Sequence, residues 1–195
     1  MRLALFASGS GSNVEAIIQA VERDELEAEI ACLFCDNPKA YVIERARKHN
    51  IPYQVISPSA VERREDWEAL ILTFVEAYQV DWIILAGFMR IVGKHLLEAY
   101  PNRIINLHPS LLPAFPGKQG ILDAFRAKVD QTGVTVHLVD EGIDTGTILG
   151  QESIKVDPTW DLKKLEEEIH AIEHRLFPQV IQQTIHENNQ QIANG

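Results

Sequence analysis

The chain has 195 residues, of which 46% are hydrophobic and 24% charged, and its formal net charge at pH 7 is −10. These proportions are ordinary for one globular domain with a full core, and the acidic balance argues against a broad basic surface for nucleic acid. Because no apolar stretch is long enough to cross a bilayer and no cleavable signal follows Met1, we expect a cytoplasmic protein without membrane contact.

A glycine-rich turn follows the first predicted strand, residues 3–7. Segment 8–13 reads Ser-Gly-Ser-Gly-Ser-Asn, and apolar residues then recur at helical spacing, which predicts a helix that begins near Asn13. Free N–H groups and the positive end of the helix dipole make such a turn an anion site. Gly9 and Gly11 fit the start of the dinucleotide fingerprint, but Val14 occupies its third glycine position, and no Walker A lysine follows.

The only two cysteines lie in the next predicted strand, residues 29–35. Cys32 and Cys35 form a C-x-x-C pattern, which raises the possibility of a redox or zinc site. A separation of three in a strand points the two thiols to opposite faces, and no second cysteine pair exists for zinc. We therefore expect both to be core residues.

The middle of the chain alternates helices and strands. We predict a helix at 40–49, a strand at 53–56, and a helix at 63–78 that turns Leu70, Phe74 and Ala77 inward. Residues 81–87 form a continuous apolar run, as in a parallel strand covered on both faces. The apolar strip at 88–92 is either core or the lining of a pocket for a flat aromatic ligand. A helix at 93–100 follows.

Segment 103–117 carries the strongest indication of a site. A strand ends at Asn106, and Asn106 and His108 are two residues apart, so strand spacing points both side chains to one face. Pro109, Pro113 and Pro116 stiffen the loop that follows. Open α/β sheets bind ligands at the carboxyl ends of their strands, which is where this loop lies.

The remaining elements complete an α/β pattern. We predict a helix at 119–129, a strand at 132–139 with Thr135, His137 and Val139 on one face, an acidic loop at 140–146 and a strand at 147–156. A last helix follows residue 158, and the chain from 187 onward is polar and predicted to fray. We expect a three-layer, open, twisted and mostly parallel sheet with helices on both faces, a Rossmann-like arrangement. It would form a single domain at 1–188 with a polar tail at 189–195.

The last predicted helix contains a pattern typical of zinc proteases. His170, Glu173 and His174 match H-x-x-E-H, which would place both imidazoles on one helix face. A catalytic zinc needs a third protein ligand, and only Glu187 remains downstream. We therefore expect no metal, with Glu173 free for another role.

Four blocks of the sequence together resemble the phosphoribosylglycinamide formyltransferase family of the folate-dependent purine pathway. They are segment 8–13, segment 85–91 (Leu-Ala-Gly-Phe-Met-Arg-Ile), segment 105–113 (Ile-Asn-Leu-His-Pro-Ser-Leu-Leu-Pro) and the loop at 140–146. They occur in the family's order across nearly the whole chain, and we expect all of them at the carboxyl ends of parallel strands. The resemblance implies the formyltransferase fold and transfer of a formyl group from 10-formyltetrahydrofolate to the amine of glycinamide ribonucleotide.

The same resemblance assigns roles to individual residues. It implies Asn106, His108 and Asp144 as the catalytic residues. The glycinamide ribonucleotide would be held by Gly11, Ser12, Asn13 and Glu173. The folate would be held by Arg64, Met89, Arg90, Ile91, Val92, Asn106 and Asp140. Both ligands are small molecules, and a monomer and a homodimer are both compatible with the sequence.

The residue types suit this chemistry. An amine that attacks a formyl carbon leaves negative charge on oxygen, which the amide of Asn106 could stabilise and a protonated His108 could neutralise. Asp144 beside the imidazole would favour its protonated form. No serine or cysteine nucleophile lies beside a base in these blocks, so we expect direct transfer without a covalent enzyme intermediate.

Three other activities compete with this interpretation. Formyltetrahydrofolate deformylase has similar loops but hydrolyses the formyl group, and it carries an extra N-terminal domain that we expect to be absent here. Methionyl-tRNA formyltransferase shares the fold, but the acidic charge opposes tRNA binding. A nucleotide-binding oxidoreductase is opposed by the missing third glycine. A binding module without catalytic activity is the remaining alternative.

Overall fold

A computed structural model of the chain describes residues 1–193. Its elements follow in the order β1 (Arg2–Ala7), α1 (Ser12–Glu22), β2 (Glu29–Cys35), α2 (Val42–Lys48), β3 (Tyr53–Val55), the 3-10 helix η1 (Pro58–Ala60), α3 (Arg64–Ala77), β4 (Trp82–Leu85), α4 (Lys94–Ala99), β5 (Ile104–His108), α5 (Gly120–Arg126), β6 (Gln131–Leu138), β7 (Ile148–Lys155) and α6 (Leu162–Ala193).

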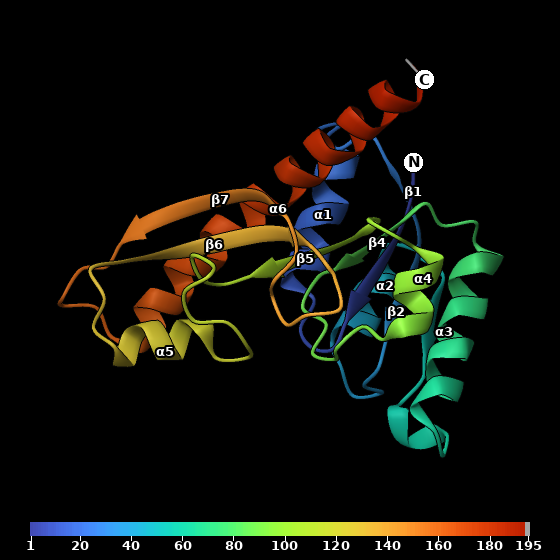
Figure 1. Cartoon of the computed structure of the whole chain (residues 1–195), viewed down its shortest axis with the longest axis horizontal. Coiled ribbons are helices and arrows are strands. Elements are labelled where there is room, and N and C mark those ends of the chain that lie inside the picture. Colours follow the sequence, from blue (N-terminus) through green and yellow to red (C-terminus); the bar gives the residue numbers. More distant parts are fainter. Residues whose placement is uncertain (194–195) are drawn as a thin grey trace.

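The strands form one open seven-stranded sheet in the order β3-β2-β1-β4-β5-β6-β7. The five strands from β3 to β5 are mutually parallel, whereas β6 and β7 are antiparallel to their neighbours. Helices α1, α2 and α6 cover one face, and α3 and α4 cover the other (Figure 1). The predicted three-layer, mostly parallel sheet is therefore confirmed.

Strand β1 shows why the sheet needs both helical layers. Leu3 and Leu5 pack into the core beneath α1 and α6, while Ala4 and Phe6 pack beneath α3 and α4. All four side chains are fully buried. A strand with apolar residues on both faces is stable only where both faces are covered.

Both cysteines are buried and form no disulfide, and they lie in different cores. Cys32 belongs to the core under α3, and Cys35 belongs to the core under α1. Burial raises the pKa of Cys32 to about 12 and also raises the pKa of Cys35, so both stay as thiols. The prediction that the two thiols face opposite sides of the sheet is confirmed.

Several predicted details are wrong. In α3, Phe74 is buried as predicted, but Leu70 and Ala77 are exposed, and Trp67, Ile71 and Val75 complete the inner face. Strand β5 extends through His108 rather than ending at Asn106, and α5 is shorter than predicted.

The C-terminal segment also differs from its prediction. Helix α6 continues to Ala193, although a frayed polar segment was expected from residue 187 onward. The helix's last turns are polar and exposed, as the composition indicates, but they keep the helical backbone. The last two residues of the predicted tail lie outside the described part of the chain. Within residues 1–193, no helix combines the length and apolarity needed to cross a membrane.

The position of the loop at 140–146 requires a correction. We expected it to follow a parallel strand, but it follows β6, which runs antiparallel to β5. In that pairing Asn106 lies opposite His137, and His108 lies opposite Thr135. The loop connects β6 to β7: it leaves β6 beside Ile105, near the start of β5, and brings Asp144 to His108.

Candidate active site

Asn106 and His108 share one side of β5, as their spacing predicts. Asn106 is half-buried and His108 is buried, and both line a cavity of about 280 Å³. On β6, His137 lies opposite Asn106 and Thr135 lies opposite His108. The two β5 side chains therefore lie beside those of a neighbouring strand. A central strand fixes both side chains more firmly than a loop would.

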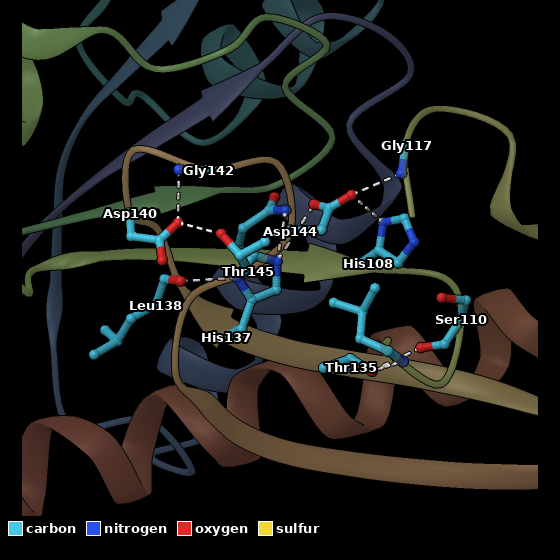
Figure 2. A network of polar contacts seen from close by, with 12 residues as sticks. His108, Ser110, Gly117, Thr135, His137, Leu138, Asp140, Gly142, Asp144 and Thr145 are labelled. Atoms are coloured by element: carbon cyan, nitrogen blue, oxygen red, sulfur yellow. Dashed lines mark hydrogen bonds and ion pairs between the residues drawn. The ribbon is translucent and has the colours of Figure 1, made fainter. Parts of the chain in front are cut away.

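Asp144 lies between two imidazoles. Its Oδ2 is 3.5 Å from Nδ1 of His108, and its Oδ1 is 3.6 Å from Nε2 of His137 (Figure 2). Oδ2 also accepts a hydrogen bond of 2.8 Å from the backbone N–H of Gly117. The predicted triad of Asn106, His108 and Asp144 therefore converges on one cavity, although its members come from two separate segments.

Both ring nitrogens of His108 have partners. Nε2 lies 2.8 Å from the carbonyl oxygen of Phe115, which only accepts, so Nε2 carries a hydrogen. Nδ1 faces Asp144 at 3.5 Å, longer than an ordinary hydrogen bond. A substrate that takes a proton from this histidine must therefore exchange places with one of these two partners.

A buried hydroxyl anchors the loop that follows His108. Thr135 Oγ1 donates to the carbonyl of Ser110 at 2.7 Å and accepts from the N–H of Leu112 at 3.1 Å (Figure 2). Nε2 of Gln151 donates both to this hydroxyl at 2.9 Å and to the carbonyl of Leu112 at 3.0 Å. Strands β6 and β7 thus fix the backbone of the proline-rich loop.

The glycine-rich turn lines a second cavity, of about 310 Å³. Helix α1 begins at Ser12, directly after Gly11, whose φ of 74° lies in the left-handed region. A Cβ at Gly11 would overlap the side chain of Val42, so both backbone conformation and space require glycine here. The first N–H groups of α1 remain available to an anion.

Glu173 of α6 closes this second cavity opposite the turn. It is buried, and its Oε2 accepts from Nδ2 of Asn13 at 3.2 Å and contacts Nδ1 of His170 at 2.9 Å. The hydrogen bond to Glu173 raises the pKa of His170, and partial burial of the imidazole opposes that rise. All four residues predicted for the ribonucleotide, Gly11, Ser12, Asn13 and Glu173, line this cavity.

The strip at 88–92 lines the first cavity. Met89 and Ile91 are more than half exposed, at 55% and 56%, whereas Val92 is buried in the core. Val92 is therefore a core residue, whereas Met89 and Ile91 present exposed side chains to the cavity. Nε of Arg90 donates to the buried carboxylate of Asp36 at 2.7 Å.

Of the residues predicted for the folate, all but Arg64 line that cavity. The Arg64 guanidinium instead donates to the carbonyl of Ile91 at the back of the strip. Asp140 holds its own loop in shape by accepting from Gly142 N at 2.9 Å and Thr145 Oγ1 at 2.8 Å.

The two cavities are neighbours. Four residues line both of them: Gly87, Met89, Leu107 and Pro109. One cavity offers backbone N–H groups for an anion, and the other offers apolar walls with an amide, an imidazole and a carboxylate. The arrangement suits a reaction between two bound molecules at their common boundary. A larger groove of about 930 Å³ lies between α1 and α6 but contains none of the converging triad.

The H-x-x-E-H pattern does not form a metal site within residues 1–193, where no three candidate ligands come together. The rings of His170 and His174 stack at 6.5 Å, and Glu173 between them is hydrogen-bonded to Asn13. Burial lowers the pKa of His174.

Sequence reasoning missed His137 and the anchoring role of Thr135 as parts of the site. The sequence did contain an indication of both residues. Thr135 and His137 alternate with apolar residues in segment 134–138, at the same spacing as Asn106 and His108. Only the antiparallel pairing of β5 with β6 brings these two patterns together.

Comparison with known proteins agrees with this geometry. A sequence model of the family described as formyl transferase matches residues 1–181. The chain is 46% identical to phosphoribosylglycinamide formyltransferase of Bacillus subtilis over 188 residues, which covers 96% of each chain. Its structure resembles that of phosphoribosylglycinamide formyltransferase from Bacillus halodurans, with a TM-score of 0.93, 46% identity and 95% of each chain covered. It also resembles glycinamide ribonucleotide transformylase 1 from Geobacillus kaustophilus, with a TM-score of 0.92, 50% identity, and 94% and 97% coverage.

Proposed function

The chain belongs to the formyl transferase family, and from this premise we propose that it transfers the formyl group of 10-formyltetrahydrofolate to the amine of glycinamide ribonucleotide. The single observation that carries this proposal is the convergence of Asn106, His108 and Asp144 in the first cavity, which shares four lining residues with the second. One cavity suits a phosphorylated substrate, and the other suits a flat apolar one.

The turn and Glu173 hold the ribonucleotide in this proposal. The phosphate accepts hydrogen bonds from the backbone at Gly11, Ser12 and Asn13, where the dipole of α1 favours negative charge. Glu173 accepts hydrogen bonds from the neutral part of the substrate, and its contact with Asn13 joins both halves of the subsite. The amine then points toward Asn106 and His108.

The strip at 88–92 and the loop at 140–144 hold the folate. Met89 and Ile91 offer apolar contacts to a flat ring, while the backbone around Asp140 offers polar groups to its edge. Arg64 supports the strip from behind through the carbonyl of Ile91. No metal takes part in the proposed reaction.

The transfer needs one bond made and one broken. The amine nitrogen attacks the formyl carbon, and the negative oxygen of the tetrahedral intermediate is stabilised by the amide of Asn106 and the imidazolium of His108. Asp144 stabilises that imidazolium across 3.5 Å. The C–N10 bond then breaks, and the proton lost by the amine ends on N10 of tetrahydrofolate.

Hydrolysis by a deformylase is less well supported. The relatives at 46% and 50% identity carry the names of transferases of this ribonucleotide. A deformylase would also have no use for an anion subsite beside the formyl-binding cavity. We place the reaction in the cytoplasm, and whether the enzyme acts as a monomer or as a homodimer does not alter the chemistry.

One assay tests the proposal. Purified protein is incubated with 10-formyltetrahydrofolate, with and without glycinamide ribonucleotide, and both tetrahydrofolate and formylated ribonucleotide are measured. We expect both products in equal amounts, and only in the presence of the ribonucleotide. Release of formate without the ribonucleotide would contradict the proposal and favour hydrolysis.

A further inference from the structure

His137 is a buried imidazole inside the candidate site that the proposed reaction does not use. It lies on β6 opposite Asn106 and is only 2% exposed. Nδ1 lies 2.8 Å from the carbonyl oxygen of Leu138, and Nε2 lies 3.2 Å from Nδ2 of Asn106. The carboxylate of Asp144 lies farther from the same Nε2, at 3.6 Å.

The carbonyl of Leu138 fixes where the hydrogen of this ring resides. A carbonyl oxygen only accepts, so Nδ1 must carry a hydrogen (Figure 2). In a neutral imidazole the other nitrogen, Nε2, then has only a lone pair and can act only as an acceptor. Its nearest polar neighbour is the side-chain amide of Asn106, which must therefore present its NH₂ group rather than its oxygen.

We propose that His137 is a positioning residue whose neutral Nδ1–H form holds the amide of Asn106 in the orientation needed to stabilise the reacting oxygen. The inference rests on the proposed function. The amide NH₂ has two hydrogens: one is held by Nε2 of His137, and the other remains for the reacting oxygen in the cavity that both residues line.

A doubly protonated His137 would undo this arrangement. Nε2–H and the amide NH₂ would then be two donors facing each other at 3.2 Å. Rotation of the amide by half a turn would relieve the conflict, but the oxygen of Asn106 would replace its nitrogen. The titratable groups that bear on His137 are Asp144 at 3.6 Å, His108 on the other side of that carboxylate, and Asp140 in the same loop.

The first test reads the protonation of the ring directly and needs no substrate. ¹⁵N NMR of the full chain with labelled histidine, assigned by comparison with His137→Gln, gives the protonation of each ring nitrogen. In spectra recorded at about pH 7.5, the contacts of Nδ1 with the Leu138 carbonyl and of Nε2 with the Asn106 amide predict the neutral Nδ1–H form. A neutral Nε2–H form, or an imidazolium, at that pH would overturn the proposal whether or not the protein transfers a formyl group.

The second test uses two substitutions that differ in their ability to accept a hydrogen bond. His137→Leu fills the space without an acceptor, whereas His137→Gln places an amide oxygen near the former Nε2. Loss of one oxyanion donor costs about 10²–10³ in kcat, so we expect His137→Leu to lower kcat by about tenfold to a hundredfold with little change in either KM. His137→Gln should recover most of the loss.

The controls separate this role from a structural one. Substitution of His95, which is exposed on α4 outside both cavities, should leave kcat unchanged. Equal activity of His137→Leu and His137→Gln, or a loss that appears in KM rather than kcat, would contradict the proposal. If the wild-type protein shows no formyl transfer, the proposed function fails, while the NMR result still decides the form of His137.

Discussion

Replacement of Thr135 by valine should destabilise the protein through hydrogen bonds alone. Thr135 is fully buried, and valine has nearly the same shape, so no cavity forms. The hydroxyl makes three hydrogen bonds, to Ser110, Leu112 and Gln151, and each contributes about 1 kcal/mol to stability. Valine also leaves the buried N–H of Leu112 without its partner, which brings the expected loss in unfolding free energy to about 2–4 kcal/mol.

The chain offers a matched control in the same strand. Thr132 is also buried, but within residues 1–193 its hydroxyl has no hydrogen-bond partner. Thr132→Val should therefore be neutral or stabilising, because it removes a buried unpaired polar atom.

Urea unfolding and thermal melting of both variants measure the difference. Thr135→Val should lower Tm by roughly 5–15 °C, and Thr132→Val should not lower it. Because Thr135 anchors the loop that follows His108, kcat should fall in the first variant as well. Equal melting temperatures for the two variants would refute the assigned role of the Thr135 hydroxyl.

Three further changes test other parts of the site. Gly11→Ala should lower Tm and raise KM for the ribonucleotide, because a Cβ at this φ of 74° would overlap Val42. Gly9→Ala is the control and should leave Tm unchanged, because the space around its Cβ is open. Similar losses of Tm in the two variants would contradict this explanation. The raised pKa of His170 means that its contact with the neighbouring carboxylate stabilises the fold fully below about pH 6.5, and that this stabilisation disappears as pH rises through the raised value. His170→Ala should thus lower Tm relative to wild type at about pH 5.5 more than at about pH 9, and a constant difference would contradict the assignment. Asp144→Asn keeps the side-chain shape but removes the charge between two imidazoles, so kcat should fall by about 10² or more, and unchanged kcat would exclude its role.

The parallel part of the sheet was predictable because its strands are apolar on both faces. The run at 82–85 is buried throughout, and a continuous apolar run is typical of a parallel strand covered on both faces. The shared side of Asn106 and His108 was predictable because residues two apart in a strand point to the same face.

Features that depend on long-range pairing were not predictable. The alternating residues of β6 do not reveal the direction in which it pairs, and the antiparallel pairing with β5 brings His137 to Asn106. The inward face of α3 was misjudged because Leu70 and Ile71 are equally apolar, and only packing against the sheet buries the second. The length of α6 was underestimated because a polar helix end has no apolar periodicity to reveal it.

The most direct test of the central claim is a single-turnover experiment that follows a labelled formyl carbon. The label starts on 10-formyltetrahydrofolate, and wild-type protein is compared with His108→Asn in the presence of glycinamide ribonucleotide. The label should appear on the ribonucleotide amine with wild-type protein, and at a rate lower by about 10²–10⁴ with the variant. Label recovered as free formate, or equal rates for the two proteins, would contradict formyl transfer by the residues that converge in the first cavity.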